Sequence, residues 1–521
     1  MAGITYKSNL LELWMHQVKE HPNKEFLLFE GANKSRRSFS YTEFYNYILQ
    51  SAKVLLDLGI KKGDLIVSQL HACPEFISLL FASSFIGAIY VPINEQAEES
   101  EIEYKLIKTK AKLAIVESPC AEVYQKLAQK HKLLEHGVLI ARLDDTNKSS
   151  DNFTHLINEN ALITHENFDA YDELSPSEEV VEIIFTSGTT ADPKGVMLTQ
   201  ANLIYSGVYG AWQVSLSDSD RFFTNMPPCH SNFQLAALMP VLYVGATIIL
   251  FEKYSASRFI EQIKETKSTI AQAVSMIVRT LLLQPARDGE QDHSLRRVLY
   301  FLPISVEEKE EFESRYNTKI QNTYGSTESI GWVLTDPPSG EQRFPSVGRA
   351  GIGYEVKIFD DHDHELQAGE IGEIVVKGIP GISLMKGYFE DERATSRALI
   401  NDWLYTGDKG YMDEDGWFYF VDRKSNMIKR QGENISSLEL EEFFESHPKV
   451  ETAAVIGVKD PIRDMAIKLF VVPKAGMSIT EEELFDYAHG QIAAFKIPSF
   501  IEIRDSLPMT VSLKVEKKLL K

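Results

Sequence analysis

The amino-acid sequence predicts an α/β protein: a large N-terminal domain of mainly parallel sheets with helices, a β-rich subdomain within it, and a small α+β domain at the C-terminus. Three observations support this. Apolar strand-like segments alternate with helix-like segments for most of the chain, which is typical of parallel sheets covered by helices on both faces. From about residue 347, short strands separated by Gly, Asp and Pro turns replace that alternation. The last hundred residues are long enough to fold separately.

The alternation starts with a buried strand over residues 65–70 and a helix over 73–86, whose apolar residues recur at helical spacing. The same pattern predicts strands over 88–92, 114–116 and 246–251, and a helix over 256–266. In the β-rich part the clearest strands are 374–378 and 417–421.

The C-terminal part contains two predicted helices and two predicted strands. A helix over residues 432–447 follows a Gly-rich turn and ends before Pro448. Strands over 455–458 and 469–472 and a helix over 480–491 complete the unit. We place the domain boundary near 423–426, which gives domains 1–423 and 424–521 with the β-rich subdomain at about 347–422.

Composition excludes several classes of function. The chain has 54 basic and 75 acidic residues and a net charge of −21, which argues against non-specific nucleic-acid binding and against docking on an anionic membrane. Its 28 Phe, 21 Tyr and 5 Trp are too many for a disordered chain. Three cysteines without a CxxC pair favour a reducing compartment over a disulfide framework or zinc site.

No segment predicts export or a membrane span. The N-terminus lacks the apolar core of a signal peptide. The longest apolar run, residues 235–251, is interrupted by Pro240, Gly245 and Thr247, and about 20 apolar residues are needed to cross a bilayer. We therefore expect a cytoplasmic protein with no nucleic-acid partner and no membrane span.

The most informative segment follows an apolar strand over residues 183–185. Five hydroxyl or glycine residues come next and a lone lysine follows: Thr186, Ser187, Gly188, Thr189, Thr190 and Lys194. Exposed backbone N–H groups, hydroxyls and an ammonium group are what a polyphosphate needs. The spacing is not that of a Walker A loop. A Ser/Thr-rich surface turn is the alternative, but it does not explain the added Pro-Lys-Gly.

This loop resembles the Thr-Ser-Gly-Ser/Thr-Thr-Gly-x-Pro-Lys-Gly motif of the adenylate-forming (AMP-forming) superfamily of acyl-CoA synthetases, adenylation domains and luciferases. It departs from the motif at Ala191, where glycine is usual. Further family motifs occur in order along the chain, so the resemblance covers nearly all of it. In segments such as 253–256, 427–430 and 461–464 the amino-acid sequence is most similar to that of crotonobetaine/carnitine-CoA ligases.

The resemblance implies a nucleotide site at residues 322–328. Tyr324, which precedes Gly325, is implied to stack on the adenine, and Thr327 to contact the α-phosphate. Glu328 is implied to hold Mg²⁺, and a hard cation does prefer a carboxylate oxygen. Without the resemblance, this segment reads more readily as a turn with a helix cap.

Three later residues complete the implied nucleotide site. Asp408 is implied to accept hydrogen bonds from both ribose hydroxyls, with Arg423 supporting the same sugar and Lys429 contacting the adenylate. Without the resemblance, Asp408 and Arg423 would be interpreted as a turn aspartate and a surface arginine.

The family's last motif resembles residues 507–515 and implies that Lys514 is the catalytic residue of the first step. A cation that bridges an attacking carboxylate and a phosphate stabilises the transition state electrostatically. Leu513 replaces the usual glycine, and Ser425 replaces the usual Asp or Lys at the hinge of a mobile C-terminal domain. Gly432 is implied to leave room for a pantetheine arm. A surface lysine in a basic tail is the alternative reading of Lys514.

The substrate pocket is expected around five residues: His230, Phe233, Met276, Ser326 and Trp332. Segments 226–234, 272–279 and 300–305 contain no acidic side chain that could bind a cation. A quaternary ammonium group could still lie against Phe233 and Trp332 by cation–π attraction. A small zwitterionic acid and a short-chain, medium-chain or aromatic carboxylic acid therefore both stay open.

These residues together predict an ATP- and Mg²⁺-dependent acid–thiol ligase that forms an acyl-adenylate and passes the acyl group to CoA. One alternative is a stand-alone adenylation enzyme that loads the phosphopantetheine arm of a carrier protein. Another, of a different class, is a nucleotide- or acyl-binding protein that has lost turnover, since Ala191, Ser425 and Leu513 depart from the family pattern.

Overall fold

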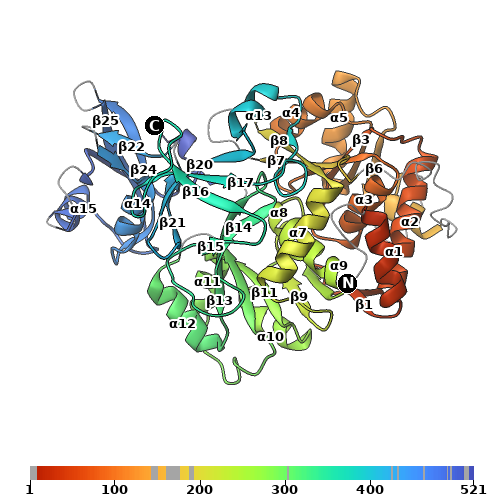
Figure 1. The fold of residues 1–521 in the computed structure, drawn as a ribbon, viewed down its shortest axis with the longest axis horizontal. Coiled ribbons are helices and arrows are strands. Elements are labelled where there is room, and N and C mark those ends of the chain that lie inside the picture. Colours follow the sequence, from red (N-terminus) through yellow and green to blue (C-terminus); the bar gives the residue numbers. More distant parts are fainter. Residues whose placement is uncertain are drawn as a thin grey trace. The chain divides into compact units, whose positions relative to one another are not determined.

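The computed structural model describes residues 9–141, 151–159, 177–186, 193–301, 304–423, 426–430, 433–460, 464–489, 491–492, 496–509 and 515–520. These residues form two compact units (Figure 1). Unit 1 takes in the described residues up to Thr186, Pro193–Val356 and Val376–Leu404. Unit 2 takes in Lys357–Val375 and the described residues from Tyr405 onward.

A seven-stranded sheet of unit 1 carries the phosphate-loop strand. Its order is β18-β8-β7-β4-β3-β5-β6, and the strands from β7 to β6 run parallel, while β8 and β18 are antiparallel to their neighbours. The strands are β3 (Leu65–Gln69), β4 (Ile89–Ile93), β5 (Leu113–Glu117), β6 (Val138–Ala141), β7 (Val180–Thr186), β8 (Lys194–Thr199) and β18 (Gly387–Tyr388). The parallel strands predicted over 65–70, 88–92 and 114–116 are confirmed.

A nine-stranded sheet has the order β15-β14-β13-β12-β11-β9-β10-β1-β2. It is parallel from β13 to β1 and antiparallel at both edges. Its strands are β1 (Glu25–Glu30), β2 (Arg36–Ser40), β9 (Arg221–Thr224), β10 (Thr247–Phe251), β11 (Ile270–Val274), β12 (Arg297–Phe301), β13 (Ile320–Ser326), β14 (Gly331–Thr335) and β15 (Arg349–Ala350). The two parallel-rich sheets confirm the predicted α/β class.

Helices pack on these sheets, and aromatic residues fill the space beneath the first three of them. The helices of unit 1 are α1 (Leu10–Glu20), α2 (Tyr41–Asp57), α3 (Pro74–Phe85), α4 (Glu99–Thr109), α5 (Ala121–His131), α6 (Phe153–Glu159), α7 (Gln200–Gln213), α8 (Ser231–Phe233), α9 (Met239–Val244), α10 (Phe259–Glu265), α11 (Ser275–Leu282), α12 (Val306–Tyr316) and α13 (Glu392–Ala398). Trp14 on α1 is fully buried and contacts the rings of Phe26 at 4.9 Å and Phe81 at 5.2 Å. Asn9 fixes the start of α1 through a capping box with Glu12.

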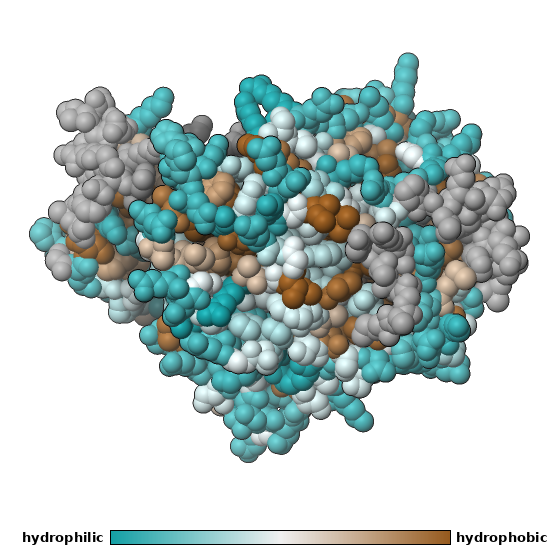
Figure 2. All heavy atoms as spheres, viewed as in Figure 1, coloured by the Kyte–Doolittle hydropathy of each residue, from teal (hydrophilic) through white to brown (hydrophobic). Residues whose placement is uncertain are grey.

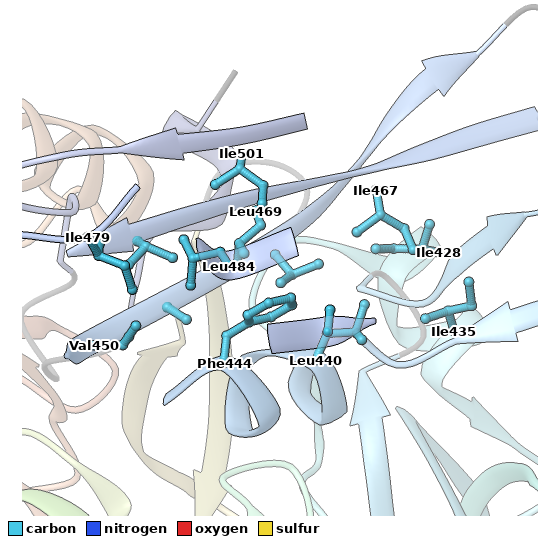
Figure 3. Close-up of a cluster of buried hydrophobic side chains, with 14 residues drawn as sticks. Ile428, Ile435, Leu440, Phe444, Val450, Ile467, Leu469, Ile479, Leu484 and Ile501 are labelled. Carbon is cyan, nitrogen blue, oxygen red and sulfur yellow. The ribbon is translucent and has the colours of Figure 1, made fainter. Parts of the chain in front are cut away.

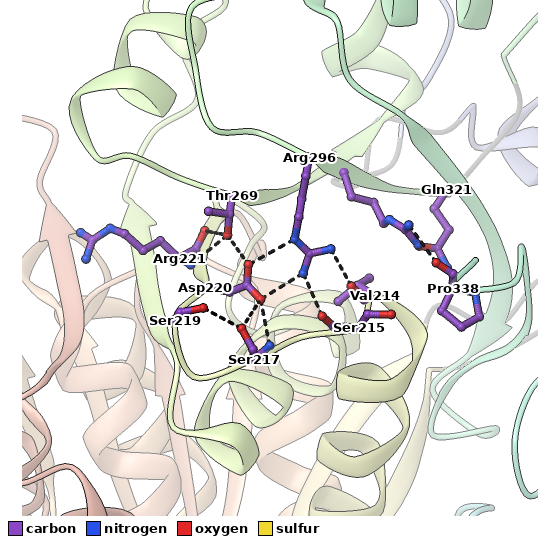
Figure 4. A network of polar contacts seen from close by, with 11 residues as sticks. Val214, Ser215, Ser217, Ser219, Asp220, Arg221, Thr269, Arg296, Gln321 and Pro338 are labelled. Carbon is purple, nitrogen blue, oxygen red and sulfur yellow. Dashed lines mark hydrogen bonds and ion pairs between the residues drawn. The ribbon is translucent and has the colours of Figure 1, made fainter. Parts of the chain in front are cut away.

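Arg296 joins the end of α7 to the starts of β9 and β12 (Figure 4). Its guanidinium donates to the carbonyl oxygens of Val214 and Ser215, each at 2.9 Å, and pairs with Asp220 at 3.0 Å. Asp220 also accepts from the Thr269 hydroxyl at 2.7 Å. Burial acts to raise the pKa of Asp220, but the hydrogen bonds from Arg296 and Thr269 outweigh it and the pKa is lowered. The network thereby satisfies carbonyl groups at a helix end that would otherwise lack donors.

A further five-stranded sheet has the order β16-β17-β20-β19, and β21 pairs with β20. The strands are β16 (Glu355–Phe359), β17 (Gly372–Lys377), β19 (Leu399–Ile400), β20 (Trp403–Met412) and β21 (Phe418–Arg423). The strands predicted over 374–378 and 417–421 are confirmed as β17 and β21.

The C-terminal part of unit 2 is an α+β arrangement. Its sheet has the order β23-β22-β25-β24, and β26 pairs with β25. The elements are β22 (Ile428–Arg430), β23 (Glu433–Ile435), α14 (Ser437–Glu445), β24 (Val450–Asp460), β25 (Asp464–Pro473), α15 (Glu481–Ala488) and β26 (Phe500–Ile503). The short 3₁₀ turn Lys517–Leu519 follows near the end of the chain.

The helix predicted over 432–447 is wrong at its start. Residues 433–435 form β23, in which Ile435 pairs with Ile428 of β22 and is fully buried. The helix begins only at Ser437, because the Ser436 side chain caps it by accepting from the backbone N–H of Glu439. Strand pairing and a cap in the middle of the predicted helix therefore override its apolar periodicity.

One face of the C-terminal sheet packs against α14 and α15 and forms a continuous apolar core (Figure 3). Phe444 of α14 lies in this core and has no exposed surface. Residues drawn around it include Ile428, Ile435, Leu440, Val450, Ile467, Leu469, Ile479, Leu484 and Ile501.

The outer surface is mostly hydrophilic on the face shown in Figure 2, where apolar side chains form several small, separate groups. Among the described residues, no helix has the length and apolarity that a membrane crossing requires.

We expect Phe444→Ala to lower the free energy of unfolding of unit 2 by about 3–5 kcal/mol, because the cavity cannot collapse in a packed core. Phe443→Ala is the matched control, since Phe443 is only partly buried against the same core. Hydrogen exchange of the β24 and β25 peptides measures the effect. Equal protection in the two variants would contradict the assignment of Phe444 to the core.

Candidate active site

The hairpin of β7 and β8 brings the predicted lysine back to the end of the phosphate-loop strand. Thr186 and Lys194 are directly opposite each other in the antiparallel register. The Thr186 hydroxyl donates to the Lys194 carbonyl oxygen at 3.4 Å. The remaining predicted loop residues, Ser187, Gly188, Thr189 and Thr190, lie outside the described residues, as does Ala191.

Tyr388 connects the lysine to the predicted metal-binding carboxylate. The Lys194 Nζ lies 4.9 Å from the centre of the Tyr388 ring, a cation–π distance. The Tyr388 hydroxyl donates to Glu328 Oε1 at 3.0 Å. The structure therefore brings Lys194 and Glu328 to the same side chain, although 134 positions separate them in the sequence.

Backbone pairing fixes this arrangement. β18 pairs with β8, so that Tyr388 is opposite Val196. The N–H of Met385 donates to the Glu328 carbonyl oxygen at 2.8 Å. Burial, followed by the charge of Glu328, raises the pKa of Tyr388, so the phenol stays neutral and acts as a donor. Sequence reasoning missed Tyr388, because an aromatic residue after a Lys-Gly pair carries no signal until β18 pairs with β8.

The predicted adenine segment forms the end of β13 and the turn after it. A Cβ at Gly325 would lie 1.8 Å from the carbonyl oxygen of Gly331, so only glycine fits there. Tyr324 and Ser326, on either side, are each partly exposed. The Thr327 hydroxyl donates to Ser231 Oγ at 3.2 Å, which joins this turn to the start of α8.

His230 lies directly before α8 and is partly exposed. Its Nε2 is 3.4 Å from Asn94 Nδ2 at the end of β4. Phe233 is fully buried, with its ring 6.3 Å from that of Phe76, so it is placed in the core.

The other two residues predicted for the pocket lie on α11 and β14. Met276 is partly exposed on α11. Trp332 stacks on Phe301 at 4.7 Å, is 7% exposed, and its buried Nε1 has no hydrogen-bond partner. The structure thus places Trp332 in an aromatic pair with one unsatisfied donor.

In unit 2, Asp408 and Arg423 are register partners on β20 and β21. Arg423 Nε lies 3.5 Å from Asp408 Oδ1. Gly407 takes a left-handed φ of 74°, and its N–H donates to Glu373 Oε1 at 3.0 Å, which fixes the turn before Asp408. The two residues predicted for the ribose are therefore adjacent.

Asp422, which sequence reasoning missed, holds the start of α14. One carboxylate oxygen accepts from Ser436 Oγ at 3.1 Å, Ser437 Oγ at 2.9 Å and the Leu438 N–H at 3.0 Å. The other accepts from the N–H of Arg423 at 2.6 Å. A buried aspartate at a helix N-terminus is a strong cap, and only the fold shows that this one is buried.

Several residues of the predicted C-terminal site lie outside the part of the chain that the structure describes. Lys514 and Leu513 lie outside the described residues, as do Gly432 and Ser425, whereas Lys429 lies in β22. Met509 and Val515, the described residues before and after the segment that contains Lys514, form an antiparallel bridge.

Lys517 then ties the chain end to α14. Its Nζ lies 2.7 Å from Glu441 Oε1 and donates to Ser437 Oγ at 2.6 Å. Burial raises the pKa of Glu441 to about 7, although Lys517 acts to lower it.

No group of three or more His, Cys, Asp or Glu side chains among the described residues could hold a metal ion. A single carboxylate such as Glu328 is nevertheless a common protein ligand of Mg²⁺, which usually completes its shell with substrate phosphates and water. The residues present therefore fit Mg²⁺ delivered with a nucleotide better than a resident metal.

Comparison with known proteins gives two matches to family models. Residues 14–389 match the AMP-binding enzyme family, and residues 439–514 match the AMP-binding enzyme C-terminal domain. A crotonobetaine/carnitine–CoA ligase of Salmonella agona (strain SL483) is 41% identical over 98% of this chain and 99% of its own length.

Solved structures of a CoA synthetase are similar to this chain over nearly its whole length. An o-succinylbenzoate CoA synthetase from Bacillus subtilis, in complex with its acyl-adenylate intermediate, superposes with a TM-score of 0.85 at 26% identity, over 98% of this chain and 97% of that chain. The same synthetase with ATP and a magnesium ion gives a TM-score of 0.84 at 26% identity, over 98% of both chains.

We expect Tyr388→Phe to weaken Mg²⁺-dependent ATP binding about tenfold, because a hydrogen bond to a charged carboxylate is lost while the ring under Lys194 stays. Tyr388→Leu removes the ring as well and should weaken binding further. Calorimetric titration with ATP, with and without Mg²⁺, measures both. If Tyr388→Phe binds MgATP like the unmodified protein, the hydroxyl does not position Glu328.

Proposed function

Because this chain belongs to the AMP-binding enzyme family, we propose that it is an ATP-dependent acid–thiol ligase that converts a small carboxylic acid into its CoA thioester. The observation that supports this proposal is the convergence of Lys194 and Glu328 on Tyr388, which brings a cation and a carboxylate to the same side chain. A polyphosphate bound with Mg²⁺ needs both groups.

The reaction has two steps. The carboxylate of the acid attacks the α-phosphorus of ATP, a P–O bond forms, and pyrophosphate leaves with the electrons of the broken P–O bond. The thiolate of CoA then attacks the acyl carbon of the acyl-adenylate, and AMP leaves. Acid activation by ATP and transfer to CoA agree with the CoA-ligase and synthetase names of the relatives.

In the first step two anions must approach each other, so the enzyme has to supply positive charge. Lys194 is assigned to the β- and γ-phosphates and Lys514 to the carboxylate and the α-phosphate, and this charge stabilises the transition state electrostatically. The Thr327 hydroxyl, next to Ser231, is assigned to the α-phosphate. Mg²⁺ held by Glu328 neutralises phosphate charge when it is bound.

The remaining assignments concern the sugar, the base and the thiol. Asp408 accepts from the ribose hydroxyls and Arg423 holds the Asp408 carboxylate, which agrees with their pairing across β20 and β21. Tyr324 stacks on the adenine, and Lys429 contacts the adenylate. We assign the hinge of the mobile domain to Ser425 and the pantetheine path to Gly432. The boundary between the two domains is assigned near residues 423–426.

For the acid, crotonobetaine and carnitine are the first compounds to test, because they name the 41% identical relative. The aromatic pair of Trp332 and Phe301 supports a cation–π contact with a quaternary ammonium group. The aromatic pair serves equally for an aryl acid, so both classes belong in one panel.

We expect acid-dependent ATP–pyrophosphate exchange with one class of a panel that contains crotonobetaine, carnitine, aryl acids and fatty acids. Lys514→Ala should lower that exchange at least about 100-fold, the usual cost of removing one transition-state charge contact. Lys518→Ala is the matched control, since Lys518 is 59% exposed and pairs only with Glu516 among the described residues.

Adding CoA or a phosphopantetheinylated carrier protein identifies the acceptor, and thioester formation with the carrier alone would overturn the CoA assignment. ATP binding without exchange for any acid would favour a binding protein that has lost turnover.

We expect Asp408→Ala to weaken ATP binding about tenfold, because two hydrogen bonds from the ribose lose their charged acceptor. The test is a cycle with 2′,3′-dideoxy-ATP. The unmodified protein should lose affinity for the dideoxy nucleotide, whereas Asp408→Ala should bind both nucleotides equally. An unequal loss in the variant would show that Asp408 does not contact the sugar.

A further inference from the structure

The strand that carries Tyr388 is too short to hold its own place. β18 has two residues. The residues on either side of it add backbone bonds to β8: the N–H of Lys386 donates to the Met197 carbonyl oxygen at 3.1 Å, and the N–H of Phe389 to that of Gly195 at 2.7 Å. Each such bond adds little net stability, so the position of Tyr388 needs support from outside the strand.

Side chains from the junction of β8 and α7 hold the turn directly before β18. Thr199 is the last residue of β8, and its hydroxyl donates to the Gly381 carbonyl oxygen at 2.6 Å. Asn202 lies in the first turn of α7, and its Nδ2 donates to the carbonyl oxygens of Ile382 at 2.8 Å and Leu384 at 2.9 Å. These two bonds use both hydrogens of the amide.

The same two residues cap helix α7, which fixes how they point. The Thr199 hydroxyl accepts from the Asn202 N–H at 3.0 Å, and Asn202 Oδ1 accepts from the Thr199 N–H at 3.0 Å. An amide turned the other way would set Oδ1 against two carbonyl oxygens, so Nδ2 has to be the donor. Thr199 and Asn202 have no exposed surface. The turn before β18 is therefore attached to the buried start of a helix.

Tyr354 also bonds this turn, and it joins the turn to the segment that carries Glu328. Its hydroxyl donates to the carbonyl oxygens of Ser383 at 2.9 Å and Ser329, the residue after Glu328, at 2.8 Å. Burial raises the pKa of Tyr354, so the phenol keeps its proton and stays a donor. The N–H of Met385 makes a second link between the two segments, because it donates to the Glu328 carbonyl oxygen at 2.8 Å.

The turn over residues 381–384 needs these side chains because most of it is buried. Buried carbonyl groups are almost always hydrogen-bonded, and the register of β18 with β8 begins only at Gly387. Loss of one side-chain donor leaves a buried carbonyl group short of a partner, which favours movement of the turn toward water. Such movement would carry Met385 with it and disturb Glu328.

We propose that Asn202 and Tyr354 are positioning residues of the ATP site, which hold the turn 381–384 and through it set Glu328 and Tyr388 against each other. Neither side chain needs to touch the nucleotide, because both act through the backbone of the turn. The consequence for binding rests on the proposed function, in which Glu328 binds Mg²⁺ delivered with ATP.

The first test is calorimetric titration of Tyr354→Phe with ATP, with and without Mg²⁺. The variant keeps the ring, which contacts the Tyr209 ring at 5.5 Å, and loses only the hydroxyl. Affinity for MgATP should fall about tenfold, whereas affinity for ATP without Mg²⁺ should change by less than about twofold.

Tyr209→Phe is the matched control for this titration. Tyr209 belongs to the same group of aromatic rings, and its buried hydroxyl has no hydrogen-bond partner in the part of the chain that the structure describes. The control should bind MgATP like the unmodified protein. Equal MgATP affinity in Tyr354→Phe and Tyr209→Phe would overturn the proposal.

Asn202→Asp separates the two roles of Asn202. The new carboxylate still accepts from the Thr199 N–H and keeps the cap of α7, and the helix N-terminus favours its charged form. It cannot donate to the carbonyl oxygens of Ile382 and Leu384. Affinity for MgATP should therefore fall at least about tenfold. An affinity equal to that of the unmodified protein would show that Asn202 acts only as a helix cap.

A double-mutant cycle shows whether Tyr354 acts through the contact between Tyr388 and Glu328. Tyr388→Phe already removes this contact, so adding Tyr354→Phe should weaken MgATP binding no further. Independent effects would add, and the double variant would then lose about a hundredfold. Such additive losses would overturn the proposal, because a general loss of stability has the same result.

Hydrogen exchange tests the same contacts without ATP or an acid, so failure of the proposed function does not affect its result. The Met385 amide, which is bonded to Glu328, should exchange about tenfold faster in Tyr354→Phe than in Tyr209→Phe. The amides of the buried strand β10 should stay equally protected in both variants. Unchanged exchange at Met385 in Tyr354→Phe would overturn the proposal even if ATP binding and turnover are normal.

Discussion

The candidate site depends on one piece of backbone pairing, the two-residue strand β18 against β8. This pairing sets Tyr388 between Lys194, at the start of β8, and Glu328, in the turn after β13. The lysine ammonium and the carboxylate do not touch in this arrangement. They share a neutral phenol, whose face attracts the cation and whose hydroxyl holds the anion. Both charges therefore stay available for a ligand that carries phosphates and a metal ion.

Side-chain hydrogen bonds hold the segment that carries His230, at a point where regular secondary structure ends. Gln234 and Gln272 bond its carbonyl groups from either side, and α8 passes directly into a π-helical turn. Such turns are rare and often lie at functional sites. The buried amides require complete hydrogen bonding, because an unsatisfied polar group in the core is costly.

Unit 2 uses acidic side chains in a different way. Asp422 caps α14 next to Arg423, and Glu441 on the same helix pairs with Lys517. The described residues after Lys514 are thereby joined to the helix that Asp422 orients. The net charge of −21 by itself does not show these local arrangements.

The sequence by itself determined the α/β class, the strand β7 that leads into the phosphate loop, and the family to which the chain belongs. These features are local: apolar periodicity, glycine and hydroxyl spacing, and short motifs read within a few residues. It misjudged residues 433–435, because the pairing of Ile435 with Ile428 comes from another strand.

Only the tertiary structure decided that Tyr388 joins Lys194 to Glu328 and that Phe233 is buried against Phe76. Each of these features depends on burial and on contacts between residues far apart in the chain. A local sequence pattern encodes neither burial nor such contacts.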